Sequence, residues 1–178
     1  FGTIRGPMPA FIFDQVDALF FGADYRWKKE WTDKISSVFG ASYLWSRNIG
    51  DNAPLINQPP ISTNVELKWN QGKVGFFDSS RWAIRPSYTF RQFQAPRTIT
   101  PENLVDGAVQ LTTNSEIFDF AAPTEGYFLL DLSWNFRREN LSGGISVQNL
   151  LNTRYRDYLN EMRYFANESG RNLLFTLK

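Results

Sequence analysis

The residues that could do chemistry in this chain are carboxylates, arginines and tyrosines, because its 178 residues include no histidine and no cysteine. That composition excludes a Ser-His-Asp triad, a cysteine nucleophile and thiolate or imidazole metal sites. Carboxylates such as Asp119, Glu125 and Asp131 are present, but no pair of them has a spacing that compels acid–base catalysis. We therefore expect a protein that is not an enzyme and that uses no cofactor and no metal.

Two long polar segments hold many of the charged and aromatic side chains, residues 94–123 and 150–170. The first exceeds the usual length of a structureless connection, about 12–15 residues, so it is either functional or folded on itself. The second is rich in tyrosine and charge. The net charge of the chain is +1 and its basic residues are scattered, so a nucleic-acid partner is not expected.

The segments that must position these residues are strands. Apolar and polar side chains alternate from Ile61 to Asn70, and similar alternation recurs about seven times along the chain. Alternation at period two is typical of a strand with one apolar face and one polar face. The predicted strands span residues 17–28, 34–47, 61–70, 81–93, 126–138, 141–149 and 171–178. Because Pro86 cannot donate a ladder hydrogen bond, we expect a bulge or irregular pairing around it.

The connections between these strands alternate in length. Those at residues 29–33, 71–80 and 138–140 are short, whereas those at 48–60, 94–123 and 150–170 are long. In an antiparallel meander, alternate connections lie at opposite ends of the sheet. The pattern therefore predicts tight turns at one end and long loops at the other, which is the asymmetry of an outer-membrane barrel.

Two solvents could cover the apolar face. A soluble sandwich or a lipocalin-like barrel would bury it inside the protein, whereas a membrane barrel would expose it to lipid. Tyrosine and tryptophan lie towards the ends of the apolar faces, as in Tyr43–Trp45, Trp69 and Trp134, and such rings favour the membrane interface. The mean hydropathy of −0.37 does not exclude lipid, since barrel strands need only about 10 residues of alternating hydrophobicity.

The last part of the chain carries the most specific pattern. Residues 146–178 read SVQNLLNTRYRDYLNEMRYFANESGRNLLFTLK. The V-x-N-L-L-N run at 147–152, Tyr155, the R-D-Y run at 156–158 and the G-R-N run at 170–172 resemble the last two strands and last extracellular loop of TonB-dependent outer-membrane receptors. T-I-R-G-P at 3–7, Asp17-Ala18 with Gly22, and the prolines at 54 and 59–60 resemble other strand-entry patterns of that family.

Three residues of this motif have a physical reading of their own. Asn149 and Asn152 can hydrogen-bond locally and tolerate turn conformations where a strand ends. Gly170 can adopt a positive φ where the loop returns. We expect all three to shape the loop rather than to contact a ligand.

The resemblance implies an all-β antiparallel meander, the C-terminal part of a transmembrane barrel of about 22 strands. Residues 1–178 would form about seven of these strands, with the plug domain and the earlier strands elsewhere in the same receptor. The expected partners are the rest of that receptor, the TonB energy-transducing complex, the lipid bilayer and a small-molecule ligand. The expected location is the outer membrane of a Gram-negative bacterium. Because the family ends in an aromatic residue, we expect the natural chain to continue past Lys178.

The resemblance also implies active import, most simply of a ferric siderophore. The loop residues that could contact such an anionic complex, through charge and ring stacking, are Arg97, Arg156, Tyr158, Arg163 and Tyr164. A solvated loop face is the alternative for each of them. Cobalamin, haem, an oligosaccharide or a peptide remain open as ligands, and a passive porin or adhesin barrel remains the alternative function.

Overall fold

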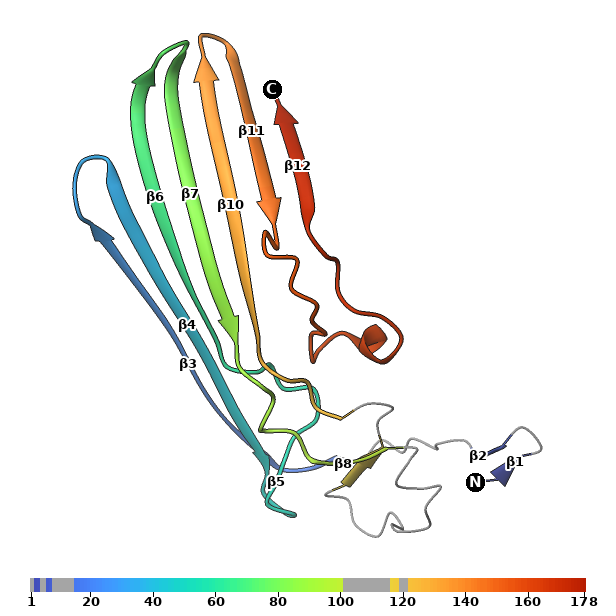
Figure 1. Cartoon of the computed structure of the whole chain (residues 1–178). Coiled ribbons are helices and arrows are strands. Elements are labelled where there is room, and N and C mark those ends of the chain that lie inside the picture. The colour runs from blue at the N-terminus through green and yellow to red at the C-terminus, as the bar shows by residue number, and fades with distance from the viewer. Residues whose placement is uncertain (1, 4–5, 8–14, 101–115, 119–121) are drawn as a thin grey trace.

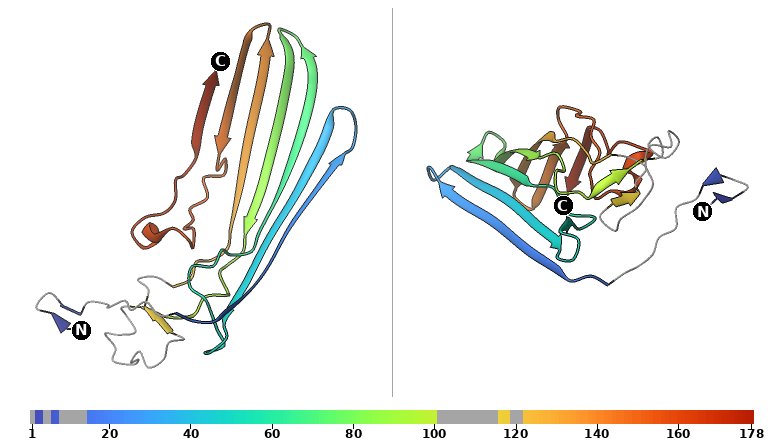
Figure 2. Two further views of the ribbon diagram at one scale, coloured as in Figure 1. Left: turned by 180° about the vertical axis from the view of Figure 1, so that it is seen from behind. Right: turned by 90° about the horizontal axis from the view of Figure 1, so that it is seen from below.

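The main body of the protein is one curved antiparallel sheet of eight strands (Figures 1 and 2). The computed structural model describes the whole chain except residues 1, 4–5, 8–14, 101–115 and 119–121. Seven long strands lie in the order β12-β11-β10-β7-β6-β4-β3, and β5 pairs with β4. The strands are β3 (Ala18–Glu30), β4 (Ile35–Asn48), β5 (Ala53–Pro54), β6 (Ser62–Val74), β7 (Phe77–Thr89), β10 (Tyr127–Arg138), β11 (Leu141–Gln148) and β12 (Asn172–Leu177).

The seven predicted strands are confirmed, but the predicted connection at 71–80 is wrong. Strand β6 continues to Val74 and β7 begins at Phe77, so only a tight turn separates them. Gly72 (φ 72°) lies at register shifts of the β6–β7 ladder, and Gly75 (φ 55°) lies in the turn. The two glycines therefore supply a bulge and a turn, since glycine adopts positive φ without steric cost.

The pairing around Pro86 is irregular, as predicted, but it contains no bulge. The β6–β7 ladder stops at Asn64–Ser87 and resumes at Leu67–Ile84 with the register unchanged. On its other side Pro86 lies opposite Leu130 in an unbroken ladder with β10. The missing N–H of proline thus interrupts one ladder without shifting it.

Short elements lie in the segments outside the main sheet. Strand β1 (Gly2–Thr3) pairs antiparallel with β2 (Gly6–Pro7). Strand β8 (Arg97–Ile99) pairs parallel with β9 (Glu116–Phe118), so the two ends of the segment 94–123 come together. The segment folds on itself to that extent, although Asp119 lies outside the described residues. The 3₁₀ helix η1 (Glu161–Tyr164) lies in the last loop.

The register places apolar residues of neighbouring strands directly opposite one another. The cross-strand pairs include Phe21–Trp45, Ile35–Trp69, Trp69–Trp82, Trp82–Trp134, Trp134–Ile145 and Ile145–Phe175. Side chains on directly paired residues share a face of the sheet. The seven long strands therefore present one continuous apolar face, and the predicted alternation is in register across the whole sheet.

The opposite, polar face carries small residues and charges of both signs. Glu66 accepts bonds from Lys68 (2.8 Å) and Arg85 (2.9 Å). Arg81 donates from Nε to Oδ1 of Asn70 at 2.6 Å. These contacts join side chains on β6 and β7 within one face, so this face is built for a polar environment.

No second layer of the described residues covers the apolar face. Trp69 is 47% exposed and Phe175 is 71% exposed, and Trp45, Trp82 and Trp134 are covered only in part. Figure 2 shows one layer of strands in both views. The packed interior that a soluble sandwich or small barrel requires is therefore not present among these residues.

The two ends of the sheet differ as predicted (Figure 1). We call the end with the tight β3–β4, β6–β7 and β10–β11 turns the turn end, and Lys178 lies near it. The opposite, loop end carries the connections at residues 49–61, 90–126 and 149–171. Alternate connections thus lie at opposite ends.

A group of rings marks the turn end of the apolar face. We call Phe77, Trp82, Trp134 and Phe136 the turn-end aromatic cluster. The rings of Trp82 and Trp134 stack with centroids 5.5 Å apart, and Trp134 also contacts Phe77 (5.4 Å) and Phe136 (4.8 Å). Trp134 Nε1 also donates to Ser80 Oγ (3.0 Å), and Ser80 Oγ donates to Gln71 Oε1 (3.2 Å). The cluster therefore joins β7 to β10 by packing and by hydrogen bonds.

Candidate ligand-binding site

The loop at residues 149–171 is held by its own side chains. Asn149 (φ 49°) donates from Nδ2 to the carbonyl of Thr153 (2.9 Å), and its Oδ1 accepts from the Thr153 N–H (2.8 Å). Asn152 (φ 54°) accepts from the N–H of Arg171 (3.0 Å). The prediction that these asparagines shape the loop is confirmed, since asparagine tolerates positive φ and bonds to nearby backbone.

The prediction of a positive φ at Gly170 is wrong. The residues with positive φ in the described part of the chain do not include it. A Cβ on Gly170 would lie 2.7 Å from Oδ1 of Asn152. The site needs glycine because the Asn152 side chain approaches the backbone closely, so its small size matters rather than its backbone freedom.

The start of the same loop is attached to strand β10. The N–H of Asn149 donates to Oδ1 of Asp131 (2.9 Å), and the N–H of Leu150 donates to the carbonyl of Leu130 (2.7 Å). Asp131, which sequence composition offered as a carboxylate for chemistry, therefore has a structural role here. Its carboxylate accepts a backbone N–H where the strand pairing ends.

A second attachment lies further along the loop. The hydroxyl of Tyr127 donates to Oδ2 of Asp157 (2.7 Å), and the rings of Tyr127 and Tyr155 lie 4.3 Å apart. Asp157 also accepts the N–H of Leu159 at Oδ1 (2.9 Å). These contacts fix residues 155–159 against the first residue of β10.

Two of the predicted contact residues are instead buried against each other. Tyr158 is 2% exposed and Arg163 is 6% exposed. The Arg163 guanidinium lies over the Tyr158 ring, with its Cζ 4.8 Å from the ring centroid, and its Nη1 donates to the Tyr158 carbonyl (2.8 Å). This cation–π pair holds the loop around helix η1 together.

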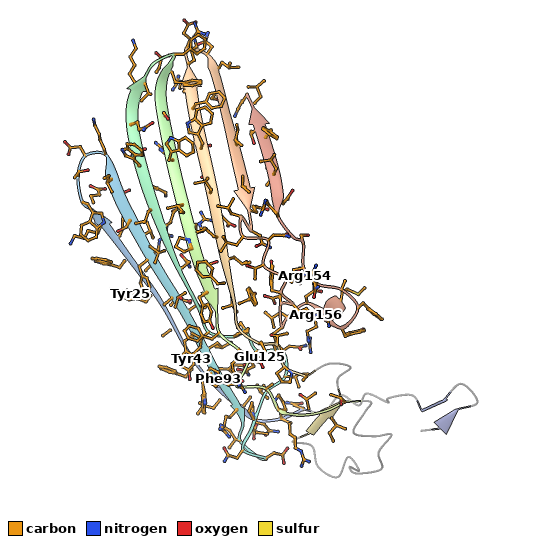
Figure 3. The ribbon with its side chains drawn as sticks, viewed as in Figure 1. Tyr25, Tyr43, Phe93, Glu125, Arg154 and Arg156 are labelled. Atoms are coloured by element: carbon orange, nitrogen blue, oxygen red, sulfur yellow. The ribbon has the colours of Figure 1, made fainter. Side chains whose placement is uncertain are left out.

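A cleft of about 280 Å³ lies between two segments at the loop end. One wall is formed by Ala122 and residues 124–127, and the other by residues 154–156 with Arg163 and Asn167. Its charged lining consists of Glu125 on the first wall and three arginines, Arg154, Arg156 and Arg163, on the second. Figure 3 labels Glu125, Arg154 and Arg156 at this end of the sheet. The excess of guanidinium groups suits a small anionic group.

The electrostatics of the second wall affect Tyr155. Burial raises the pKa of its phenol above the usual value, and the carboxylates of Glu168, Asp157 and Asp131 raise it further. Each of these causes disfavours the phenolate. Tyr155 is therefore a neutral ring and a hydrogen-bond donor at physiological pH.

The structure brings three of the five predicted contact residues into or beside this cleft. Arg156 and Arg163 line it, and Tyr158 packs beneath Arg163. Tyr164 contacts Phe165 with ring centroids 4.2 Å apart. Arg97 is exposed on β8, in the other long loop. The contact role predicted for the five residues stays a prediction.

Sequence reasoning missed Arg154 and Asn167 and considered Glu125 only as a possible catalytic carboxylate. Arg154 stands two residues before Arg156, so the basic–aromatic alternation of residues 154–158 was the available signal. Asn167 accepts the Nε–H of Arg156 (3.0 Å), which orients that guanidinium. No sequence signal places Glu125 beside these residues.

In the described part of the chain, no group of three or more histidine, cysteine, aspartate or glutamate side chains is arranged to hold an ion. The same residues include no helix that is both long and apolar enough to cross a membrane.

Comparison with known proteins bears on the fold. The structure is similar to that of the copper transporter OprC, with a TM-score of 0.70 and 19% sequence identity over 91% of this chain. The chain spans 23% of the length of OprC. The predicted fold class is confirmed, because the all-β antiparallel sheet matches the C-terminal part of an outer-membrane β-barrel. No protein-family model matches the chain, and no curated protein matches it.

Proposed function

We propose that this chain forms part of the wall and the extracellular loops of a TonB-dependent outer-membrane import receptor. Its remaining strands, its plug and its TonB-contacting segment belong to the rest of that receptor. The turn end faces the periplasm and the loop end faces the medium. The apolar face contacts lipid, and the polar face lines the barrel lumen.

The continuous, uncovered apolar face carries this proposal. It spans seven strands in register, and a sheet in water would have to cover it. Strands β3, β4, β6, β7 and β10 have 12 to 14 residues. That length exceeds the approximately 9–11 residues that a tilted strand needs to cross a bilayer. Long loops at one end only are typical of an outer-membrane barrel, and the likeness to a transporter fold supports the same interpretation.

For the ligand we propose an anionic ferric siderophore. The arginine-rich cleft at the loop end supports an anion, because guanidinium groups bind carboxylate and similar oxyanions in pairs of hydrogen bonds. A second candidate is copper, which the name of the similar transporter suggests. Copper in its reduced state prefers cysteine, methionine and imidazole ligands. This chain has two methionines and no cysteine or histidine, so most such ligands would come from the rest of the receptor.

Uptake by whole cells tests the proposal. The complete receptor is expressed in paired Gram-negative strains with and without TonB, and each strain is given radiolabelled ferric siderophores or radiolabelled copper. We expect saturable uptake of a ferric siderophore in the TonB strain only. An empty vector is the control for background transport.

Each other outcome has a definite meaning. TonB-dependent uptake of copper but not of ferric siderophore would keep the transporter and replace the ligand. Uptake that persists without TonB and rises linearly with concentration would identify a passive porin. Recovery of the complete receptor as a soluble monomer without detergent would refute the membrane assignment.

A further inference from the structure

The cleft at the loop end has an unequal distribution of charge. Three arginines and one glutamate line it, which leaves an excess of two positive charges in a volume of about 280 Å³. A compact charged group such as a carboxylate or a phosphate fits this space.

The three arginines differ in what already occupies them. Arg163 is buried and holds the Tyr158 carbonyl and ring. Arg156 is exposed and uses its Nε–H for Asn167. Arg154 is exposed and has no hydrogen bond or ion pair to any residue that the structure describes. Since a guanidinium carries five N–H donors, Arg154 and Arg156 retain most of theirs for a ligand.

The walls around these two arginines are held in place without a ligand. Asn167 orients the Arg156 guanidinium, and the N–H of Glu168 donates to the carbonyl of Tyr155 (2.9 Å). On the opposite wall the Tyr127 hydroxyl donates to Asp157 (2.7 Å), which ties that wall to the arginine segment. Such preorganisation lowers the entropy cost of binding.

We infer that this cleft is a binding site for a compact, multiply charged oxyanion, with Arg154 and Arg156 as the residues that contact it. A carboxylate-rich group and a phosphate share the required chemistry. Arginine binds both through two parallel N–H···O bonds. Glu125 lines the opposite wall, and its like charge opposes an anion, so the bonds from both arginines must outweigh that repulsion. The inference rests on the proposed function, because a ligand reaches the cleft only if the loop end faces the medium.

Calorimetric titration of the complete receptor in detergent tests the site, with citrate and inorganic phosphate as the probes. The test variant is Arg154→Gln with Arg156→Gln. The control is Arg171→Gln, which removes an exposed arginine of the same loop that does not line the cleft. We expect the double variant to bind the preferred probe at least about tenfold more weakly, whereas the control stays within about twofold.

A difference in gel migration between heated and unheated samples verifies that each variant retains a folded barrel. Tighter binding of citrate than of phosphate identifies a carboxylate ligand, and the reverse order identifies a phosphate ligand. The inference is overturned if the wild-type receptor binds neither probe or if the double variant binds as well as the wild type. It is also overturned if Arg171→Gln weakens probe binding as much as the double variant does, because binding would then depend only on the overall charge of the loop.

The uptake experiment separates this inference from the proposed function. If uptake depends on TonB but the double variant binds the probes as well as the wild type does, the proposed anion site is refuted and the proposed transporter function stands. If probe binding depends on both arginines but uptake is the same with and without TonB, the anion site stands and the proposed active transport is refuted.

Discussion

The turn end and the loop end of the sheet are held together by different kinds of contact. At the turn end, rings pack on the apolar face, and the single side chain of Trp134 contacts three other rings, those of Phe77, Trp82 and Phe136. At the loop end, asparagines, carboxylates and tyrosines bond to backbone and to one another, as Asn149 does with Thr153 and Tyr127 does with Asp157. Stability of the strands therefore depends on the first region, and the shape of the candidate binding site depends on the second.

This division has a physical reason. Packed rings need neighbours at fixed positions, so they belong where the strands are continuous and the turns are tight. Directional hydrogen bonds can fix a loop that has no repeating backbone pattern. Substitutions at the two ends should consequently change different measurements.

Replacing Trp134 with alanine should have the largest effect. Trp134→Ala removes three ring contacts, each worth about 0.5–1.5 kcal/mol, and the indole bond to Ser80, so we expect a loss of about 3 kcal/mol of unfolding free energy. The measurement is urea unfolding of the complete receptor in lipid vesicles.

The control is Trp45→Ala on the same face at the loop end, where Trp45 has Arg47 over its ring at 5.8 Å. We expect it to lose less than half as much. Equal losses in the two variants would contradict the special role of the turn-end aromatic cluster.

Gly143→Ala should have the next largest effect. A Cβ there would overlap Cζ of Phe136, a ring held within the turn-end aromatic cluster, so the ring must move at a cost of about 2 kcal/mol. The same unfolding measurement applies. Gly40→Ala is the matched control, because its Cβ would meet the flexible Asn64 amide at 2.9 Å.

A second substitution checks the cause. Phe136→Leu in the Gly143→Ala background removes the ring that the new methyl group meets. It should recover part of the lost stability, and no recovery would show that the ring is not responsible.

Asn149→Ala should loosen the loop end while leaving the strands intact. It removes the bonds to Thr153 and places alanine at φ 49°, a cost of about 1–2 kcal/mol confined to residues 149–171. Limited proteolysis of cells that display the receptor should cut this loop faster, with unchanged urea unfolding of the barrel.

Asn149→Asp keeps an acceptor oxygen for the Thr153 N–H and tolerates the same φ, so its cleavage rate should lie between those of the wild type and Asn149→Ala. A fall in barrel stability equal to that of Trp134→Ala would refute the separation of the two ends.

The smallest effect is a pH dependence of the loop. The pKa of Tyr155 is raised in the folded protein above its ordinary value of 10.0, so the folded state favours the neutral phenol. The stability that the neutral Tyr155 phenol gives to the folded loop is fully present below pH 10, and it is lost as the pH rises through the pKa of Tyr155 in the folded protein. The measurement is a pH titration of phenolate absorbance in the wild type and in Tyr155→Phe. The difference between the two curves is the signal of Tyr155, and it should appear at a higher pH than that of an ordinary tyrosine. A signal at the pH of an ordinary tyrosine would contradict the burial of Tyr155.

The strands were predictable from the sequence because one face had to be apolar on every strand. A slip of one residue would move Trp69 or Trp134 to the polar face, so the alternation fixes the register as well. The β6–β7 turn was missed because Gly72 and Gly75 look like a loop in the sequence. In the structure Gly72 lies within the β6–β7 ladder, and Gly75 lies in the tight turn that joins the two strands.

The candidate site was only partly predictable. Tyr158 and Arg163 look like solvated loop residues, but the return of the chain through η1 brings them together and buries both. Glu125 and Arg154 come from different loops, and their proximity depends on how β10, β11 and the last loop fold back. No local pattern of the sequence encodes that proximity.

The anchoring of the last loop suggests how recognition can diversify. Its base is joined to the sheet through Leu150, whose N–H bonds to Leu130, and is closed by Asn152 and Arg171. Residues 154–169 lie inside this closed base. Under the proposed function, a chimera that exchanges only that interior between two receptors should insert into the membrane as well as its parents, while its cargo preference follows the donor.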